Sequence, residues 1–248
     1  MNIFVAELHV HTVLSPCAEV EMIPPFIIQE AQERGINLLA ITDHNAIANI
    51  QAVQKAAAGT GITVLPGIEL QTREEVHSLC LFDTFEQVNS LHQLIAPLLP
   101  KIENDAEHFG EQFVVDETGE FIRRENQLLI TSADISLNDA FDAVRTLGGL
   151  FIPAHVNRKA FGLLANLGLV PTDIAIQALE ISRHVKSDEA YVKFPQIKGY
   201  PLIQSGDVHR LDEFLGVNEF YCVEPTIAEL TKAILGQDGR KLKLAPII

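Results

Sequence analysis

The amino-acid sequence predicts an α/β barrel, and three observations support that prediction. Short apolar runs alternate with helical patterns along the 248 residues, as in repeated strand–helix units that build a parallel sheet. Metal-ligating residue types recur where such runs begin or end, from His9 to His209. The carboxyl ends of all strands meet at one mouth in a closed barrel, whereas an open doubly wound sheet gathers its site at one switch point. Polar strand ends spread along the whole chain therefore favour the barrel.

The expected elements follow from local patterns. A helix over 24–34 places Phe26, Ile27 and Ala31 at helical spacing before Gly35, a natural terminator. Other helices are expected at 46–58, 84–99, 138–147 and 227–235, with helical turns from 158. Strands are expected at 3–11, 37–42, 62–69, 78–82, 150–153, 178–181, 201–204 and near 220–223.

Residues 100–136 interrupt this alternation. They are polar, and a turn at 116–120 separates the apolar runs 113–115 and 121–122. This pattern predicts a hairpin within an insertion, inside a single domain that spans residues 1–248. The insertion either lines the mouth of the barrel or forms an interface.

The bulk composition excludes several classes of protein. No stretch approaches the roughly 20 apolar residues of a membrane span. The net charge of −15 repels polyanions, so we expect no extended duplex nucleic acid as partner. Small phosphorylated molecules and short strands remain compatible, because bound cations neutralise carboxylates locally. Three scattered cysteines, and no basic segment before a hydrophobic block, predict a cytoplasmic protein.

Histidines and carboxylates at the strand ends predict a metal centre. His9 and His11 alternate along one strand and so share a face. Imidazole and carboxylate ligands suit zinc, manganese or iron better than calcium. The candidate ligands are His9, His11, His44, Glu69, His77, His155, Asp207 and His209. The set exceeds what one ion needs, so we expect two or three divalent ions, with Glu69 able to bridge two of them about 3.5–4 Å apart.

Each residue alone also has an ordinary interpretation. His155 could be a core histidine, His77 a surface residue in a charged stretch, and Asp43 a helix cap. Only the joint pattern favours metal binding. Arg158 and Arg183 lie near the expected mouth and suit bidentate contact with phosphate, although either is equally compatible with an ordinary surface arginine.

With these residues assembled, the sequence resembles the PHP (polymerase and histidinol phosphatase) family of metal-dependent phosphoesterases. The matching motifs are His9-Val10-His11, Thr42-Asp43-His44, Glu69 with His77, His155, and Asp207-Val208-His209. The resemblance implies a distorted (β/α)₇ barrel, TIM-like, with its metal site at the C-terminal mouth of the strands. It implies one ion held by His9, His11, Glu69 and Asp207, a second by Glu69, His77 and His155, and a third by His44 and His209.

The sequence departs from the family's pattern at two positions. Glu7 stands where the family usually has aspartate. Cys17, six residues after His11, stands where a ligand of the third ion, often histidine, is expected. A thiolate ligand there would favour zinc or iron. Otherwise Cys17 is a loop cysteine and the third site is weak or empty.

The function implied is hydrolysis of a phosphate ester by a metal-activated hydroxide at a di- or trinuclear centre. Asp43, Glu69 and His209 are the expected catalytic residues, and Arg158 and Arg183 the expected substrate contacts. The substrate would be a phosphomonoester of a small metabolite or nucleotide, or a short oligonucleotide. The alternative is a non-catalytic metal-binding PHP barrel with a structural or partner-binding role. An amidohydrolase-like enzyme is disfavoured because no carboxylated-lysine-type motif is found. Leaving group, native metal and oligomeric state are left open.

Overall fold

The computed structural model describes residues 1–247. A seven-stranded sheet has the order β11-β10-β1-β2-β3-β4-β7, and β8 and β9 form a separate parallel pair. The strands are β1 (Asn2–Val10), β2 (Leu38–Ile41), β3 (Thr63–Gln71), β4 (His77–Leu81), β7 (Leu150–Pro153), β8 (Leu179–Ser182), β9 (Leu202–Ser205), β10 (Asn218–Cys222) and β11 (Lys241–Leu244).

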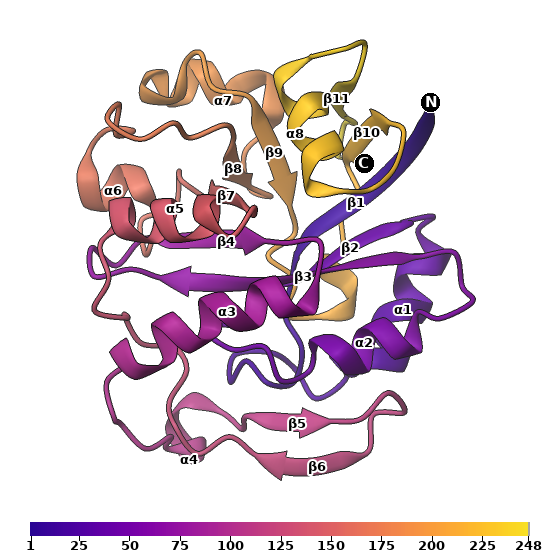
Figure 1. Cartoon of the computed structure of the whole chain (residues 1–248), viewed down its shortest axis with the longest axis vertical. Coiled ribbons are helices and arrows are strands. Elements are labelled where there is room, and N and C mark those ends of the chain that lie inside the picture. Colours follow the sequence, from indigo (N-terminus) through magenta and orange to yellow (C-terminus); the bar gives the residue numbers. More distant parts are fainter. Residues whose placement is uncertain (248) are drawn as a thin grey trace.

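The sheet curls so that the β8–β9 pair lies between β7 and β1 (Figure 1). β8 contacts β7, and the segment after β9 joins β1 through two backbone hydrogen bonds, His11 N to Val208 O and Val208 N to His9 O, each 2.9 Å. Strands β1, β2, β3, β4, β7, β8 and β9 thus surround one interior, while β10 and β11 extend the sheet beyond β1. The predicted distorted barrel is confirmed.

The strand directions correct one expectation, because the sheet is mixed rather than parallel. β4 runs antiparallel to both β3 and β7, and β10 antiparallel to β1. Only the turn at 72–76 joins β3 to β4, and so short a connection makes a hairpin rather than a crossover. The first residue of β4, His77, therefore lies at the same mouth as the last residues of the parallel strands.

A shift in register on β1 points its histidines inward. Ala6 and Leu8 belong to the cluster of apolar side chains inside the barrel, whereas Val10 belongs to the cluster outside it. Pairing with β2 shifts by one residue between Glu7 and Val10, as at a β-bulge. The bulge turns His9 and His11 toward the interior.

The helices cover the outside of the barrel and close its base. They are α1 (Pro24–Glu33), α2 (Ile50–Ala56), α3 (Phe85–Ile95), α4 (Ala106–Phe109), α5 (Leu137–Thr146), α6 (Leu163–Leu167), α7 (Ser187–Lys193) and α8 (Ile227–Leu235), with 3-10 turns at Ala96–Leu98, Pro195–Ile197 and Leu211–Glu213. α8 packs Leu230 and Ala233 against the inner cluster. α2 begins four residues later than expected because the Asn49 amide, hydrogen-bonded to Thr12 and Phe113, holds the preceding turn. No helix within residues 1–247 is long and apolar enough to cross a bilayer.

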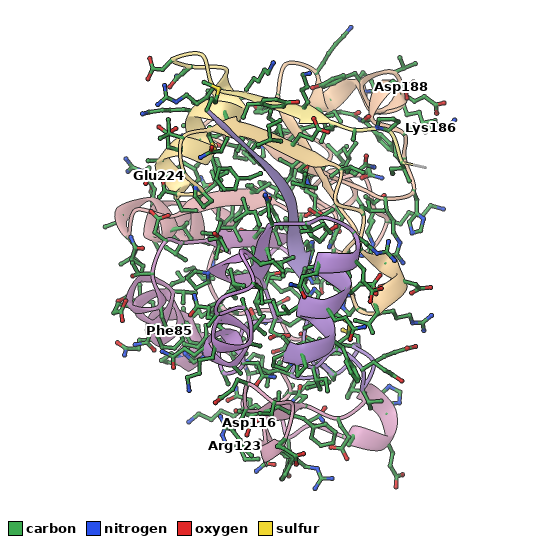
Figure 2. The ribbon with its side chains drawn as sticks, turned by 90° about the vertical axis from the view of Figure 1, so that its right-hand side faces the viewer. Phe85, Asp116, Arg123, Lys186, Asp188 and Glu224 are labelled. Carbon is green, nitrogen blue, oxygen red and sulfur yellow. The ribbon has the colours of Figure 1, made fainter. Side chains whose placement is uncertain are left out.

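Residues 100–136 form the expected hairpin of β5 (Phe113–Val115) and β6 (Phe121–Arg124). The hairpin lies at one end of the molecule, where Asp116 and Arg123 point outward, opposite the end that carries Lys186 (Figure 2). It braces the loop after β1, since the Phe113 amide donates to the Val13 carbonyl at 2.8 Å. Val114 and Leu129 add a small apolar cluster with Leu14 and Ala46.

Candidate metal centre

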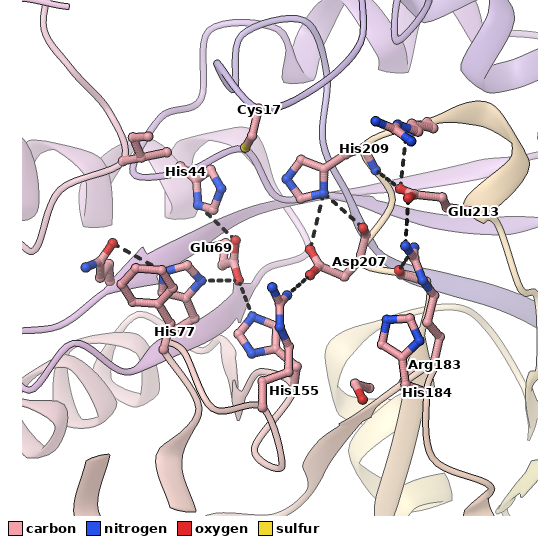
Figure 3. Close-up of a pocket in the computed structure, with 17 residues that line it drawn as sticks. Cys17, His44, Glu69, His77, His155, Arg183, His184, Asp207, His209 and Glu213 are labelled. Atoms are coloured by element: carbon pink, nitrogen blue, oxygen red, sulfur yellow. Dashed lines mark hydrogen bonds and ion pairs between the residues drawn. The ribbon is translucent and has the colours of Figure 1, made fainter. Parts of the chain in front are cut away.

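The candidate ligands converge at the mouth of the barrel, on one cavity (Figure 3). The Glu69 carboxylate, fully buried on β3, lies at their centre. Its Oε1 is 2.7 Å from His77 Nδ1, 3.1 Å from His155 Nε2 and 3.2 Å from His9 Nε2. Its Oε2 is 2.9 Å from His44 Nδ1 and 3.3 Å from His11 Nε2. Residues from four different strand ends thus share one carboxylate.

Several atoms in this cluster have no hydrogen-bond partner among the described residues. They are Nε2 of His9 and of His11, Nδ1 of His44 and Oε2 of Glu69, all buried. An unsatisfied buried polar group costs about 1–3 kcal/mol. A cluster of such atoms facing one another fits divalent cations, which take imidazole nitrogens and carboxylate oxygens together.

Three groups of ligand atoms, with the atoms of each group within 4.8 Å of one another, fit metal ions. They are His9 with His11, Glu69 and Asp207; His44 with Glu69 and His77; and His11 with His44 and His209. The first group is the set that the resemblance implies. The second contains His44 where His155 was expected, although His155 also faces Glu69. The third adds His11 to the expected pair.

Buried partners orient the imidazoles. His9 Nδ1 lies 3.0 Å from Glu180 Oε2, and both side chains are fully buried. His209 Nδ1 lies 2.9 Å from the Asp207 carbonyl, which only accepts, so Nδ1–H donates there. When the outer nitrogen carries the proton, Nε2 keeps its lone pair for a cation. Glu180 was not identified from the sequence, although a carboxylate inside the apolar run 178–181 was a usable signal.

Asp43 holds the loop after β1 and does not line the cavity. Its carboxylate accepts from the Thr12 amide at 2.7 Å, the Thr12 hydroxyl at 2.8 Å and the Ser15 hydroxyl at 2.8 Å. Ser15 Oγ then lies 3.0 Å from His11 Nδ1 and accepts its proton. Asp43 therefore orients His11 through Ser15.

Burial and mutual charge set the protonation states. Burial raises the pKa of Glu69, but His77, His9 and His44 together hold it well below its usual range. Burial lowers the pKa of His77 to about 4. Burial also lowers the pKa of His44, but Cys17 and Glu69 raise it to about 9 overall. Near neutral pH Glu69 is thus ionised and His77 keeps a free lone pair, whereas His44 must lose a proton before it can bind a cation.

Two candidate ligands have unusual backbone conformations. His155 has φ of 28° and Asp207 has φ of 52°, in the left-handed region that residues other than glycine rarely adopt. Such conformations cost about 1–3 kcal/mol each and persist where surrounding contacts impose them. Both follow strand ends, where the chain must turn sharply to aim a side chain back at the mouth.

The Glu7 side chain is hydrogen-bonded to the loop that carries Asp207 and His209. Its carboxylate accepts from the amides of Gly206 at 2.8 Å, Leu215 at 2.7 Å and Gly216 at 3.1 Å. Complete burial raises the pKa of Glu7 to about 7 despite these hydrogen bonds. Glu7 therefore positions both ends of the loop from outside the barrel rather than contacting the ligands.

The cavity has a volume of about 570 Å³, and Cys17, Arg158 and Arg183 line it as expected. Arg158 pairs with Asp207. Arg183 donates to the Gly206 carbonyl at 2.6 Å and to Glu213 at 2.7 Å. Cys17 lies beside His44 but in none of the three ligand groups. Further lining residues, among them Gln71, Phe161 and Glu213, were not identified from the sequence.

Comparison with known proteins supports this geometry. Residues 7–146 match the PHP domain. The uncharacterized protein YqxK of Bacillus subtilis strain 168 is 24% identical over 269 residues, 96% of this chain and 63% of YqxK. A 5′-3′ exoribonuclease of Haemophilus influenzae is 33% identical over 69 residues, 28% of this chain and 24% of that protein.

Among solved structures, the lesion-specific endonuclease PfuEndoQ of Pyrococcus furiosus superposes with a TM-score of 0.76 at 20% identity, over 97% of this chain and 58% of PfuEndoQ. A complex of Endonuclease Q with a 27-mer duplex that has an abasic lesion at the active site gives a TM-score of 0.72. This chain therefore spans less than two thirds of the length of YqxK and PfuEndoQ. At this identity the likeness shows the shared fold.

Proposed function

The chain belongs to the PHP family, and on that premise we propose that it hydrolyses a phosphate ester with the help of divalent metal ions. The substrate is a phosphomonoester of a nucleotide or small metabolite, or the end of a short oligonucleotide. The observation that carries the proposal is the cluster of buried, unpartnered nitrogen and oxygen atoms around Glu69, open to a cavity that arginines line.

The proposed ligands are the three groups around Glu69, with His155 as a further ligand on its Oε1 side. Divalent ions held there would supply Lewis-acid stabilisation of phosphoryl oxygens and activation of water. Glu69 belongs to two groups and so links two ion sites. Cys17, beside His44, is an added ligand for the third ion in this proposal.

The chain's own residues then bind and orient the ester. Arg183 is held by Glu213 and Gly206, so its guanidinium is fixed for contact with a phosphoryl oxygen. Arg158 pairs with Asp207 and lines the same cavity. Burial and His11 keep the pKa of His209 well below its ordinary value, which favours the neutral ring whose Nδ1–H donates to the Asp207 carbonyl and whose Nε2 keeps a lone pair for a cation.

A second candidate is cleavage within a nucleic-acid strand. The observation that favours it is the likeness in fold to Endonuclease Q, which was solved with a lesion-containing duplex. The net charge of −15 opposes wide contact with a duplex. We therefore place a short or locally unpaired strand, rather than an extended duplex, within the proposed substrate range.

The test pairs metal analysis with product release. Protein purified without chelator is assayed for zinc, manganese and iron, then incubated with nucleoside phosphates, sugar phosphates, short oligonucleotides and an abasic-site duplex. We expect more than one equivalent of metal and release of phosphate or a cleaved strand. Glu69→Gln should lose both, whereas Glu189→Gln, an exposed carboxylate on α7, should lose neither.

Turnover that survives both chelation and Glu69→Gln would contradict the proposal. Metal-loaded protein that is silent on every substrate would instead favour the non-catalytic barrel.

A further inference from the structure

The cavity has an apolar end that the chemistry at Glu69 does not explain. Of the described residues that line it, Ile130 and Phe161 are the ones with large apolar side chains. The other lining residues are polar, charged or small. Phe161 stacks on His77, and Figure 3 shows His77 at the end of the cavity opposite Arg183 and His184.

Phe161 is held in one orientation. Its ring stacks on the His77 imidazole with centroids 4.6 Å apart and planes 9° from parallel. Its carbonyl accepts from the His77 amide at 3.1 Å. Its φ is 58°, which costs free energy for a residue other than glycine and indicates that surrounding structure imposes the position.

The turn that presents Phe161 is unusually tight. A Cβ on the next residue, Gly162, would lie 2.2 Å from the Arg158 carbonyl oxygen, so only glycine fits there. The same turn therefore holds both Arg158 and Phe161 at the wall of one cavity.

Phe161 nevertheless leaves 39% of its surface exposed. A ring that only covered His77 would gain more free energy if its remaining surface were buried as well. An aromatic ring with fixed orientation and a free face stacks on planar rings, and every nucleobase offers such a face.

Ile130 supports the same end of the cavity from residues 100–136. The neighbouring Leu129 and Thr131 carbonyls each accept from the Asn45 side chain at 2.8 Å, and Ser132 Oγ accepts from Gln71 at 2.9 Å. Gln71 in turn contacts His77. The segment is thus tied to the ligand-bearing strands and brings an aliphatic side chain to the cavity that Phe161 also lines.

We propose that Phe161, with Ile130, is the specificity-determining platform that stacks on a planar ring in the substrate, while the phosphate lies toward Glu69 and the arginines. The inference rests on the proposed phosphoesterase function and narrows its substrate class to esters that carry an aromatic base.

The experiment compares adenosine 5′-monophosphate with ribose 5-phosphate, which share the same phosphate ester and differ only in the base. The wild-type protein should favour the nucleotide. Phe161→Ala should raise KM for the nucleotide about tenfold or more relative to KM for the sugar phosphate, the range of one stacked base. Phe161→Trp should restore the preference, and Phe161→Leu, which still covers His77, should not.

Phe121→Ala is the matched control, since Phe121 is 57% exposed on the β6 hairpin outside the cavity. Equal loss on both substrates in Phe161→Ala, or no preference in the wild type, overturns the inference and leaves the phosphoesterase proposal standing.

Binding of the two ligands by calorimetry separates the two proposals when neither substrate turns over. Nucleotide binding that depends on Phe161 without turnover supports the platform and counts against catalysis on this substrate. Binding that does not depend on Phe161 overturns the platform.

Discussion

Replacing Glu180 tests whether the buried carboxylate behind His9 tunes the metal centre. His9 Nδ1 lies 3.0 and 3.3 Å from the two Glu180 oxygens, and neither side chain is exposed. Glu180→Gln keeps an acceptor but removes the charge that makes the imidazole a stronger ligand. Such outer partners of a metal-bound histidine contribute about 10–100-fold in metal affinity.

The structure sets where in that range each variant should fall. Glu180→Gln should weaken binding at the low end, about tenfold or 1.4 kcal/mol, because the hydrogen bond survives. Glu180→Ala also leaves the Nδ1–H buried without a partner, at about 1–3 kcal/mol, and should approach a hundredfold. His9 belongs to only one of the three ligand groups, so the loss of metal affinity should be confined to one ion site.

The assay is calorimetric titration of chelator-stripped protein with zinc or manganese, with metal content measured after gel filtration. Glu229→Gln is the matched control, a buried carboxylate that binds Arg240 far from the cavity. Affinity in Glu180→Gln equal to that of the wild type would refute the reasoning. Equal weakening at every ion site would show a general loss of structure instead.

Three further predictions follow from the same contacts. Stripping the ions should lower Tm, because ligand at about 100 times its Kd stabilises by about 2.7 kcal/mol; an unchanged Tm in differential scanning calorimetry would contradict ion binding at the Glu69 cluster. Glu7→Asp should shorten the reach to the Leu215 and Gly216 amides and cost about 1–3 kcal/mol, with faster hydrogen exchange in residues 206–216; unaltered exchange there would show that Glu7 does not hold the loop. Hydrogen bonds from Arg240, the Val223 amide and Lys232 lower the pKa of Glu229 to about 2, so its contribution to stability is present above the ordinary carboxyl pKa near 4.5 and is lost as the pH falls toward 2. The free energy of unfolding of Glu229→Gln in urea should therefore depend less on pH over that interval than that of the wild type. The same pH dependence in both proteins would contradict this prediction.

The barrel and the convergence of ligands were predictable because strand ends could be identified one at a time. Glu69, His155 and Asp207 each lie in or just after an apolar run, and parallel strands bring such ends together. His77 fits only because β4 runs the other way, so that its first residue reaches the mouth. A ligand that precedes an apolar run thus indicates a strand that runs opposite to one whose ligand follows the run. The expectation of a parallel sheet did not use this difference.

What the sequence concealed depends on contacts across long separations. The bulge on β1 is a property of its pairing with β2, and Asp43 acts through Ser15 only once the loop after β1 has folded back. Phe161 looked like one apolar residue among many, since its left-handed backbone and its stacking on His77 arise from tertiary structure. Local sequence patterns identified the candidate metal ligands, but not the residues that orient those ligands.

The narrow join between the segment after β9 and β1 has a consequence for how the protein unfolds. Two backbone hydrogen bonds at Val208 join the β8–β9 pair to β1, whereas Asp207 and His209, on the same segment, share ligand groups with His9 and His11. Ions bound at this join would therefore act as a cross-link between the last and first strands of the barrel. The cooperativity of unfolding is then expected to depend on metal supply: the loaded protein should melt in one transition, and the stripped protein should release β8 and β9 first.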